Sequence, residues 1–263
     1  MLDHTQADMA IRAYLDIQKE MGLDPAGGQV VFPDLAETLE RLTRKPADAL
    51  LFGVAADGMP LYLHLRDPRP GPILLTGQKG SGKTRFLKTI VRAAERFSSS
   101  PMACFAALTD YPADFDDMND AQTLMGVWGS YQPESAQMLS KLADRVERPS
   151  RNSSPILLLI DGLESVLQMS SEAQEDLAYI FTHGPGTMVW PVVTVNAEIA
   201  VMLPEWLSYF RTRIFGRIAN PRTSEALTYL PGAPLNNLFP GNQFCQRLNS
   251  EWIKFWLPSL GEG

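Results

Sequence analysis

Two patterns of apolar and polar positions alternate along the chain. Short runs of consecutive apolar residues are followed by segments in which apolar residues recur at helical spacing. Strands and helices in alternation predict an α/β fold, in which a mostly parallel sheet carries helices on both faces. Runs such as "ILLLI" are typical of strands buried on both sides. The predicted core strands are 73–76, 102–110, 155–160, 188–196 and 212–218, and the predicted helices are 83–97, 133–148, 171–184, 200–210 and 221–230.

Two hairpins are predicted at the borders of this core. Residues 50–54 and 61–65 read as strands on either side of Asp57-Gly58, a dipeptide typical of tight hairpin turns. The segments "NQFCQRL" and "EWIKFWL" predict a closing hairpin near the end of the chain.

Residues 1–48 are predicted to form a small N-terminal helical appendage, and residues 49–263 the main domain. Residues 5–21 have helical periodicity, and the glycine-containing stretch 22–28 interrupts it. A second short helix is expected after Asp34, whose carboxylate suits the N-cap position.

Composition and charge narrow the class of protein. The chain has 263 residues, of which 45% are hydrophobic and 20% charged, as in ordinary globular proteins. Its formal net charge of -7 argues against a protein that simply coats DNA, although DNA held in a local basic channel stays compatible with it. The sequence shows no apolar run of membrane length and no signal-peptide core, so we expect a cytoplasmic protein without a membrane part.

The segment "GQKGSGKT" lies between the strand 73–76 and the helix 83–97, and it matches the P-loop pattern G-x-x-x-x-G-K-[ST]. Its glycines let successive backbone N–H groups turn toward a β-phosphate, and the helix adds its positive end. Lys83 is placed to neutralise phosphate charge and the Thr84 hydroxyl to ligate Mg²⁺. The sequence therefore predicts a P-loop NTPase with a RecA-like sheet that binds ATP and Mg²⁺. The predicted nucleotide-binding residues are Gly77, Gln78, Lys79, Gly80, Ser81, Gly82, Lys83, Thr84 and Arg85.

Asp161 ends the run "PILLLI", where a Walker-B aspartate would hold Mg²⁺ through water. A hydrolytic ATPase usually has a glutamate next, whereas this chain has Gly162. Glu164 can replace that base if the turn folds back toward the γ-phosphate. The other interpretation is a solvated carboxylate at a helix start, which the helix dipole favours. The sequence leaves both open.

Further polar residues are candidates for the same site. Asn196 ends the strand 188–196 and can orient the attacking water or sense the γ-phosphate, or it can simply start a turn. Arginines 211, 213, 217 and 222 gather around one strand, and such a cluster either stabilises a neighbouring subunit's γ-phosphate or forms ordinary surface ion pairs.

The order of these features resembles the FtsK/HerA superfamily of ring-forming P-loop ATPases, in particular the motor domain of FtsK-type DNA translocases. The resemblance covers residues 49–263. It rests on "LFGVAADGMPLYLHL" before the P-loop, "ILLTGQKGSGKT", "FAALTDYP", "TRIFGRIANPRTSEAL" and the closing "LFPGNQFCQRL".

This resemblance implies a homo-oligomer, since the family forms hexameric rings that use ATP to move duplex DNA. Lys83 and Asp161 carry over as catalytic residues, with Thr84 and Asp161 as Mg²⁺ ligands. Asn196 matches the polar residue after the fourth core strand, and Arg213 and Arg217 match the arginines of "TRI-x-x-R", which implies a role between subunits.

Departures from the family pattern weaken the implied DNA translocation. The family's Asp-Glu pair is Asp161-Gly162 here, and its lysine after the second strand is replaced by Tyr111-Pro112. "LLLIDGLESV" also resembles the Walker B of NACHT and related signalling ATPases, which are nucleotide-controlled switches. Two hypotheses follow: an oligomeric ATPase motor, or a nucleotide-dependent scaffold or switch that binds partner proteins and hydrolyses slowly or not at all.

Overall fold

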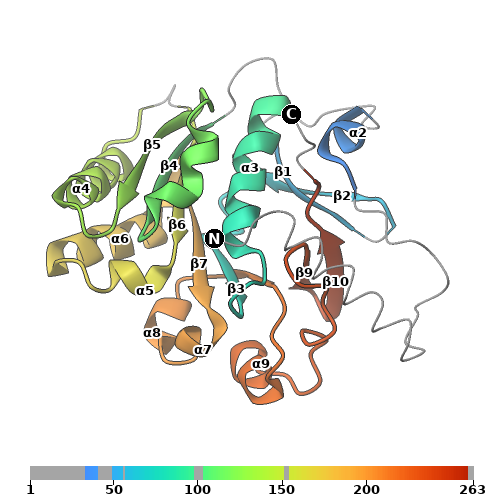
Figure 1. Cartoon of the computed structure of the whole chain (residues 1–263). Coiled ribbons are helices and arrows are strands. Elements are labelled where there is room, and N and C mark those ends of the chain that lie inside the picture. Colours follow the sequence, from blue (N-terminus) through green and yellow to red (C-terminus); the bar gives the residue numbers. More distant parts are fainter. Residues whose placement is uncertain (1–32, 41–48, 56, 98–102, 151–153, 260–263) are drawn as a thin grey trace. The chain divides into compact units, whose positions relative to one another are not determined.

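The structure, a computed structural model, describes residues 33–40, 49–55, 57–97, 103–150 and 154–259 (Figure 1). They belong to one compact unit, Pro33–Gly263. The predicted helix at 5–21 and the predicted boundary at residue 48 lie outside the described residues.

The described residues form ten strands that share a single sheet. The strands are β1 (Ala49–Ala55), β2 (Pro60–His64), β3 (Ile73–Gly77), β4 (Cys104–Thr109), β5 (Leu124–Gly129), β6 (Ile156–Asp161), β7 (Val189–Asn196), β8 (Thr212–Phe215), β9 (Gln243–Leu248) and β10 (Glu251–Trp256). Their order is β2-β1-β10-β9-β8-β3-β7-β6-β4-β5. The strands from β8 to β5 are parallel, and the two hairpins extend the sheet with antiparallel strands. The predicted α/β class and both hairpins are confirmed.

Helices cover both faces of this sheet. They are α2 (Leu35–Glu40), α3 (Lys83–Phe97), α4 (Pro133–Glu147), α5 (Leu163–Val166), α6 (Ser171–His183), α7 (Ala197–Ala200), α8 (Pro204–Leu207) and α9 (Pro221–Thr228), with 3-10 helices η1 (Pro112–Met118) and η2 (Gly184–Thr187). None of the helices in this described part is long and apolar enough to cross a lipid bilayer.

The strand pattern explains why both faces are covered. Along β3, Leu74 packs in a cluster with residues of α4 and α6, whereas Ile73 and Leu75 pack with residues of α3. Successive side chains of a strand point to opposite faces, so a strand that is apolar at every position needs a helix on each side.

The short helix α2 begins at the predicted N-cap. Asp34 Oδ1 accepts hydrogen bonds from the backbone N–H groups of Ala36 (2.9 Å) and Glu37 (3.1 Å). Leu35 is fully buried and packs in a cluster with Leu51 of β1 and Ala93 of α3.

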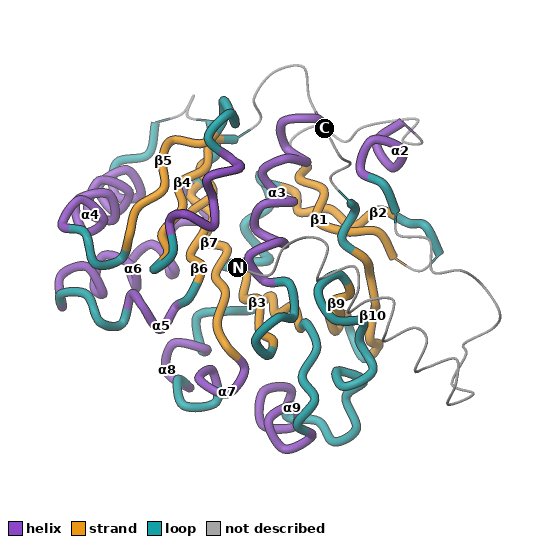
Figure 2. Tube along the Cα trace, viewed as in Figure 1, coloured by secondary structure: helices purple, strands orange, loops and turns teal. Residues whose placement is uncertain are grey.

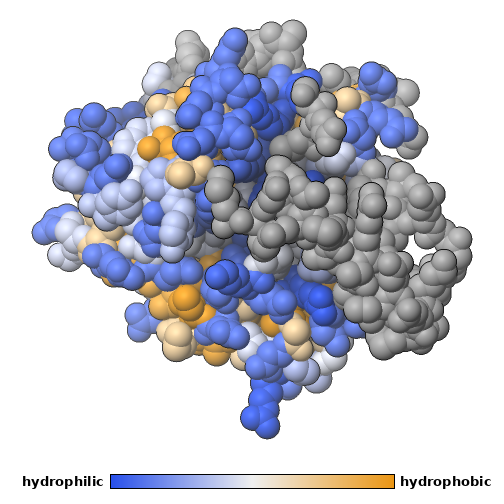
Figure 3. Space-filling model, in the orientation of Figure 1, coloured by the Kyte–Doolittle hydropathy of each residue, from blue (hydrophilic) through white to orange (hydrophobic). Residues whose placement is uncertain are grey.

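The local structure differs from the sequence prediction in two places, a strand that was missed and a helix that is divided. The strand β5 was not predicted, because Gly126 and Gly129 weaken its β signal and as an edge strand it is only half-buried. The predicted helix 200–210 is split into α7 and α8 (Figure 2). Pro204 lacks an N–H group, so it can begin α8 but cannot continue a helix that is already running. Between them Met202 is 70% exposed, and Figure 3 shows apolar surface over α7 and α8.

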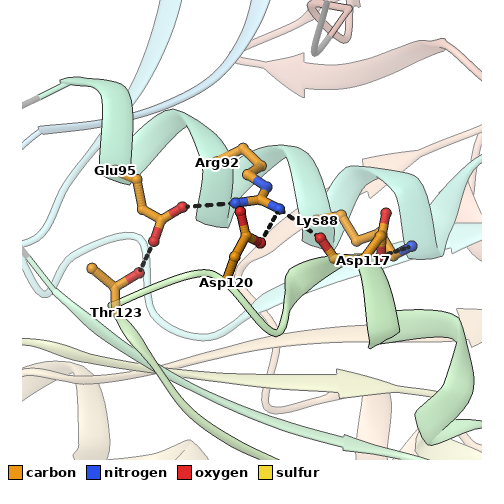
Figure 4. A network of polar contacts seen from close by, with 6 residues as sticks. All are labelled: Lys88, Arg92, Glu95, Asp117, Asp120 and Thr123. Atoms are coloured by element: carbon orange, nitrogen blue, oxygen red, sulfur yellow. Dashed lines mark hydrogen bonds and ion pairs between the residues drawn. The ribbon is translucent and has the colours of Figure 1, made fainter. Parts of the chain in front are cut away.

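The segment 110–120, "DYPADFDDMND", is acidic and contains η1, and a polar network holds it against α3 (Figure 4). The guanidinium of Arg92 donates to the Asp117 carbonyl (2.5 Å) and to Asp120 Oδ1 (2.6 Å). The ammonium of Lys88 lies 2.7 Å from the Asp117 carboxylate. Two carboxylates of the acidic segment are thereby neutralised by the helix that follows the P-loop.

Candidate nucleotide site

The candidate site lies at the carboxyl ends of the parallel strands, where polar residues from distant parts of the sequence meet. The P-loop connects β3 to α3, and Asp161 and Asn196 end β6 and β7. In the sheet β7 lies between β3 and β6, which brings these three strand ends together. This edge is where α/β folds bind their ligands.

The P-loop backbone requires glycine at two positions. Gly80 and Gly82 have φ values of 78° and 92°, in the left-handed region. A Cβ atom on Gly82 would lie 2.1 Å from the carbonyl oxygen of Gly241, whereas one on Gly80 would meet no atom within 4 Å. The loop that precedes β9 therefore packs directly on the P-loop backbone.

Gln78 ties the P-loop to the segment that follows β8. Its backbone N–H donates to the Arg217 carbonyl (3.0 Å), and its side-chain Oε1 accepts from the Ala219 N–H (2.9 Å). A P-loop pattern allows any residue at this position, so the sequence did not reveal this bracing role.

The ammonium of Lys83 is hydrogen-bonded to the backbone of the P-loop. Its Nζ donates to the carbonyl oxygens of Gly77 (3.0 Å) and Gln78 (3.1 Å). Burial lowers the pKa of Lys83, and the charges of Asp161 and Glu164 oppose that shift. A partly buried cation held by carbonyl dipoles is well placed to receive phosphate oxygens.

A chain of hydroxyl and carboxylate groups links three elements across the site. Thr84 Oγ1 donates to Asp161 Oδ2 at 2.6 Å, and Thr194 Oγ1 donates to Asp161 Oδ1 at 2.7 Å. The N–H of Gly162 donates to Thr194 Oγ1 (3.0 Å). Thr194 was missed at the sequence level, although its hydroxyl is the one polar side chain inside the apolar run "VVTV".

Glu164 and Asn196 both border the site, but their side chains differ in their hydrogen bonds. Glu164 Oε2 is buried and has no hydrogen-bond partner among the described residues. Burial raises the pKa of Glu164, and the Lys83 charge and the Asn196 N–H oppose that shift. Asn196 Oδ1 accepts from the Glu198 N–H (3.2 Å) and so caps α7, which is the turn-starting role that the sequence left open.

These groups surround a cavity of about 370 Å³, within the range of roughly 300–1,000 Å³ usual for small-molecule sites. Tyr111 and Asp114, which were not predicted as site residues, also line it. The other lining residues are Lys79, Gly80, Gly82, Lys83, Thr84, Arg85, Asp161, Gly162, Glu164, Thr194 and Asn196.

The residues present fit a nucleotide with its Mg²⁺. The P-loop has its left-handed glycines and its buried lysine. The Thr84 hydroxyl and Asp161 carboxylate, the oxygen donors that Mg²⁺ prefers, are in contact. The partnerless Glu164 oxygen lies beside them in the lining of the same cavity.

The two predicted arginines lie outside the set of residues that line the cavity. The Arg213 guanidinium donates to the carbonyl oxygens of Leu207 (2.8 Å) and Phe210 (3.3 Å) and lies 5.9 Å from the Tyr229 ring centroid. The Arg217 carbonyl is the partner of Gln78. Their role between subunits stays a prediction.

The amino-acid sequence of this chain is similar to part of one curated human protein. No family model matches the chain. The human protein "ATPase SWSAP1" is 31% identical over 128 residues, which cover 44% of this chain and 55% of the relative. The chain thus matches about half the length of this curated relative.

Solved structures extend the likeness to nearly the whole chain. EssC (ATPases 2 and 3) from Geobacillus thermodenitrificans has a TM-score of 0.68 at 14% identity and covers 98% of this chain and 51% of its own. Thermomonospora curvata EccC (ATPases 2 and 3) in complex with a signal sequence peptide has a TM-score of 0.63 at 13% identity, with 88% and 44% covered. The pCW3 conjugation coupling protein TcpA, in monomer form with ATPγS, has a TM-score of 0.61 at 14% identity, with 89% and 71% covered.

The chain shares the fold of these solved structures, two of which are named as ATPases. The fold expected from the sequence resemblance is therefore confirmed. The chain spans about half the length of the first two of these structures.

The two left-handed glycines give a matched pair of variants. Gly80→Ala should lower the free energy of unfolding by about 1–2 kcal/mol, the cost of a Cβ in the left-handed region. Gly82→Ala should cost more, because its Cβ must also displace the Gly241 backbone. Urea unfolding of both variants measures the difference, and equal losses would contradict the close approach.

Glu164→Gln is expected to stabilise the protein in a pH-dependent way. Because burial raises the pKa of Glu164 in the folded state, wild-type stability falls as the pH rises from about 4.3 through that raised value. The glutamine variant avoids this loss. It should therefore melt at a higher temperature than the wild type at pH 8 and at the same temperature as the wild type near pH 4.

Melting curves at both pH values measure this effect. The exposed Glu225 on α9 provides the control, since Glu225→Gln should shift the melting temperature little at either pH. A Glu164→Gln gain of the same size at pH 4 and pH 8 would show that ionisation of Glu164 is not its cause.

Proposed function

We propose that this chain is a Mg²⁺-dependent ATPase of the FtsK/HerA superfamily. The observation that carries the proposal is the 2.6 Å hydrogen bond between Thr84 and Asp161, which lie 77 residues apart. It joins the end of a P-loop to the end of a neighbouring buried strand, beside the buried amine of Lys83. The fold shared with solved P-loop ATPases and the likeness to the human "ATPase SWSAP1" support it.

Each residue of the site has a role in this proposal. Thr84 and Asp161 would hold Mg²⁺, Asp161 through water, and Lys83 would neutralise β- and γ-phosphate charge. The backbone N–H groups of Gly80, Ser81 and Gly82 would surround the β-phosphate. Bound Mg²⁺ supplies electrostatic stabilisation of the charge that develops on the transferred phosphoryl group.

Glu164 is the proposed general base, in place of the glutamate that usually follows the Walker-B aspartate and is Gly162 in this chain. Its carboxyl group lines the cavity, and the raised pKa makes its carboxylate a stronger proton acceptor than an exposed glutamate. It would accept the proton of the attacking water at one of its oxygens. Asn196 borders the same space, and with its Oδ1 committed to α7 it would act as a fixed wall of the site.

A nucleotide-dependent scaffold or switch is the second candidate function. Gly162 favours it, since it stands where a hydrolytic glutamate is usual and takes φ 104°, a conformation suited to glycine. In that case ATP binding would alter assembly or partner binding, with slow or absent turnover.

Turnover measurements separate the two candidates. Lys83→Ala should abolish ATP binding, and Glu164→Gln should keep binding while lowering kcat by about 10²–10⁴-fold, the usual contribution of a general base. Lys141→Ala, at an exposed position of α4, is the control and should match wild type. Nucleotide binding and phosphate release, measured with and without duplex DNA, give the readout.

Each outcome of that assay has a meaning. Wild-type binding without turnover in either condition would favour the switch, and stimulation by duplex DNA would favour a translocase. Unchanged turnover in Glu164→Gln would remove Glu164 from the mechanism.

We further propose that the chain assembles as a homo-oligomer, with the ring architecture that its sequence resemblance implies and Arg213 and Arg217 near the boundary between subunits. The carboxylates of the acidic segment 110–120 would repel the phosphates of duplex DNA. We therefore include partner proteins, besides DNA, among the candidate substrates of a ring. Mass photometry with ATP should show multimers that Lys83→Ala loses. Monomers in every condition would refute the ring.

A further inference from the structure

We propose that Asp110 is a positioning residue that orients Glu164 through the hydroxyl of Ser165. The inference rests on the proposed function, in which Glu164 is the base of the nucleotide site. Asp110 follows β4, and β4 lies between β5 and β6 in the sheet. The carboxylate of Asp110 is therefore placed between two neighbouring strand ends.

Both oxygens of this carboxylate have a hydroxyl partner. Ser130, which follows β5, donates its hydroxyl to Oδ1, and Ser165 of α5 donates its hydroxyl to Oδ2. Asp110 is not among the residues that line the nucleotide cavity. With both oxygens engaged and no contact with the cavity, Asp110 is not a second base and acts only through its partners.

The helix α5 needs such an anchor because it has only four residues. A helix this short has too few internal hydrogen bonds to fix its own orientation. At its start, Gly162 has a φ of 104°, and its N–H donates to Thr194 Oγ1 (3.0 Å). The buried Ser165 is held by Asp110. Besides the core packing of its buried Leu163 and Val166, the helix has two polar attachments, one to β7 and one to the end of β4.

Glu164 lies in sequence between these two attachment points. One of its carboxyl oxygens is buried without a partner, so its position depends strongly on the backbone that carries it. If the hydrogen bond at Ser165 is lost, Leu163 and Val166 still hold α5 on the core, but the backbone that carries Glu164 can shift locally. A displacement of about 1 Å at a reacting group can cost about 10²-fold in rate.

The two hydroxyls allow the positioning role to be separated from a structural one. Ser165→Ala removes the branch that leads to Glu164, and Ser130→Ala removes the branch that leads to the edge strand β5. We expect Ser165→Ala and Asp110→Ala to lower kcat at least tenfold with little change in the KM for ATP. Ser130→Ala should retain wild-type kcat, and Ser165→Thr should recover most of the activity that Ser165→Ala loses.

A double-variant series tests whether the effect passes through Glu164. In a Glu164→Gln background, adding Ser165→Ala should lower the residual turnover no further, because both changes remove the same contribution. Equal losses of kcat for Ser130→Ala and Ser165→Ala would overturn the inference. So would a normal kcat in Ser165→Ala when Glu164→Gln is impaired, and that result leaves the proposed ATPase function standing.

A second readout does not depend on catalysis. The carboxyl pKa of Glu164 can be followed by ¹³C NMR of the protein without nucleotide, with the signal assigned by its loss in Glu164→Gln. Lys83 and Asp161 are the charged groups that act on it. Ser165→Ala should move this pKa toward the ordinary glutamate value as water enters, and Ser130→Ala should leave it unchanged. An unmoved pKa in Ser165→Ala would overturn the inference even if the wild-type protein hydrolyses no ATP.

Discussion

The hydrogen bond between the Thr84 hydroxyl and the Asp161 carboxylate joins the two halves of the nucleotide site. Its geometry requires that β3 and β6 end at the same edge of the sheet with β7 between them. That arrangement in turn requires parallel strands connected by helices on both faces. The apolar sequence of β6 and the helices packed on it therefore hold the Asp161 carboxylate opposite Thr84 at the end of the P-loop.

Charge within the site is balanced at short range. The buried amine of Lys83 is attracted by Asp161 and Glu164, while burial disfavours the ionised forms of both Lys83 and Glu164. The net charge of -7 for the whole chain says little about this region, because two carboxylates of the neighbouring acidic segment are already paired with Lys88 and Arg92 of α3. A nucleotide polyphosphate would approach a surface less negative than the composition suggests.

Much of this architecture follows from the sequence, and the remainder has identifiable physical causes. The P-loop, the strand that ends at Asp161 and both hairpins could be predicted, because glycine placement and apolar runs are local signals. The edge strand β5 could not, since its glycines and half-exposed side chains give no clear alternation. The contacts of Gln78, Thr194 and Asp110 also could not, because each depends on a strand neighbour distant in sequence.

The attachment of Gln78 to the segment after β8 gives the P-loop a mechanical connection to another part of the surface. One bond runs from its backbone to Arg217 and another from its side chain to Ala219. Through these two bonds, a rearrangement that phosphate imposed on Gln78 would also displace residues 217–219. Nucleotide occupancy would then affect the segment that holds Arg217 by a route outside the hydrophobic core.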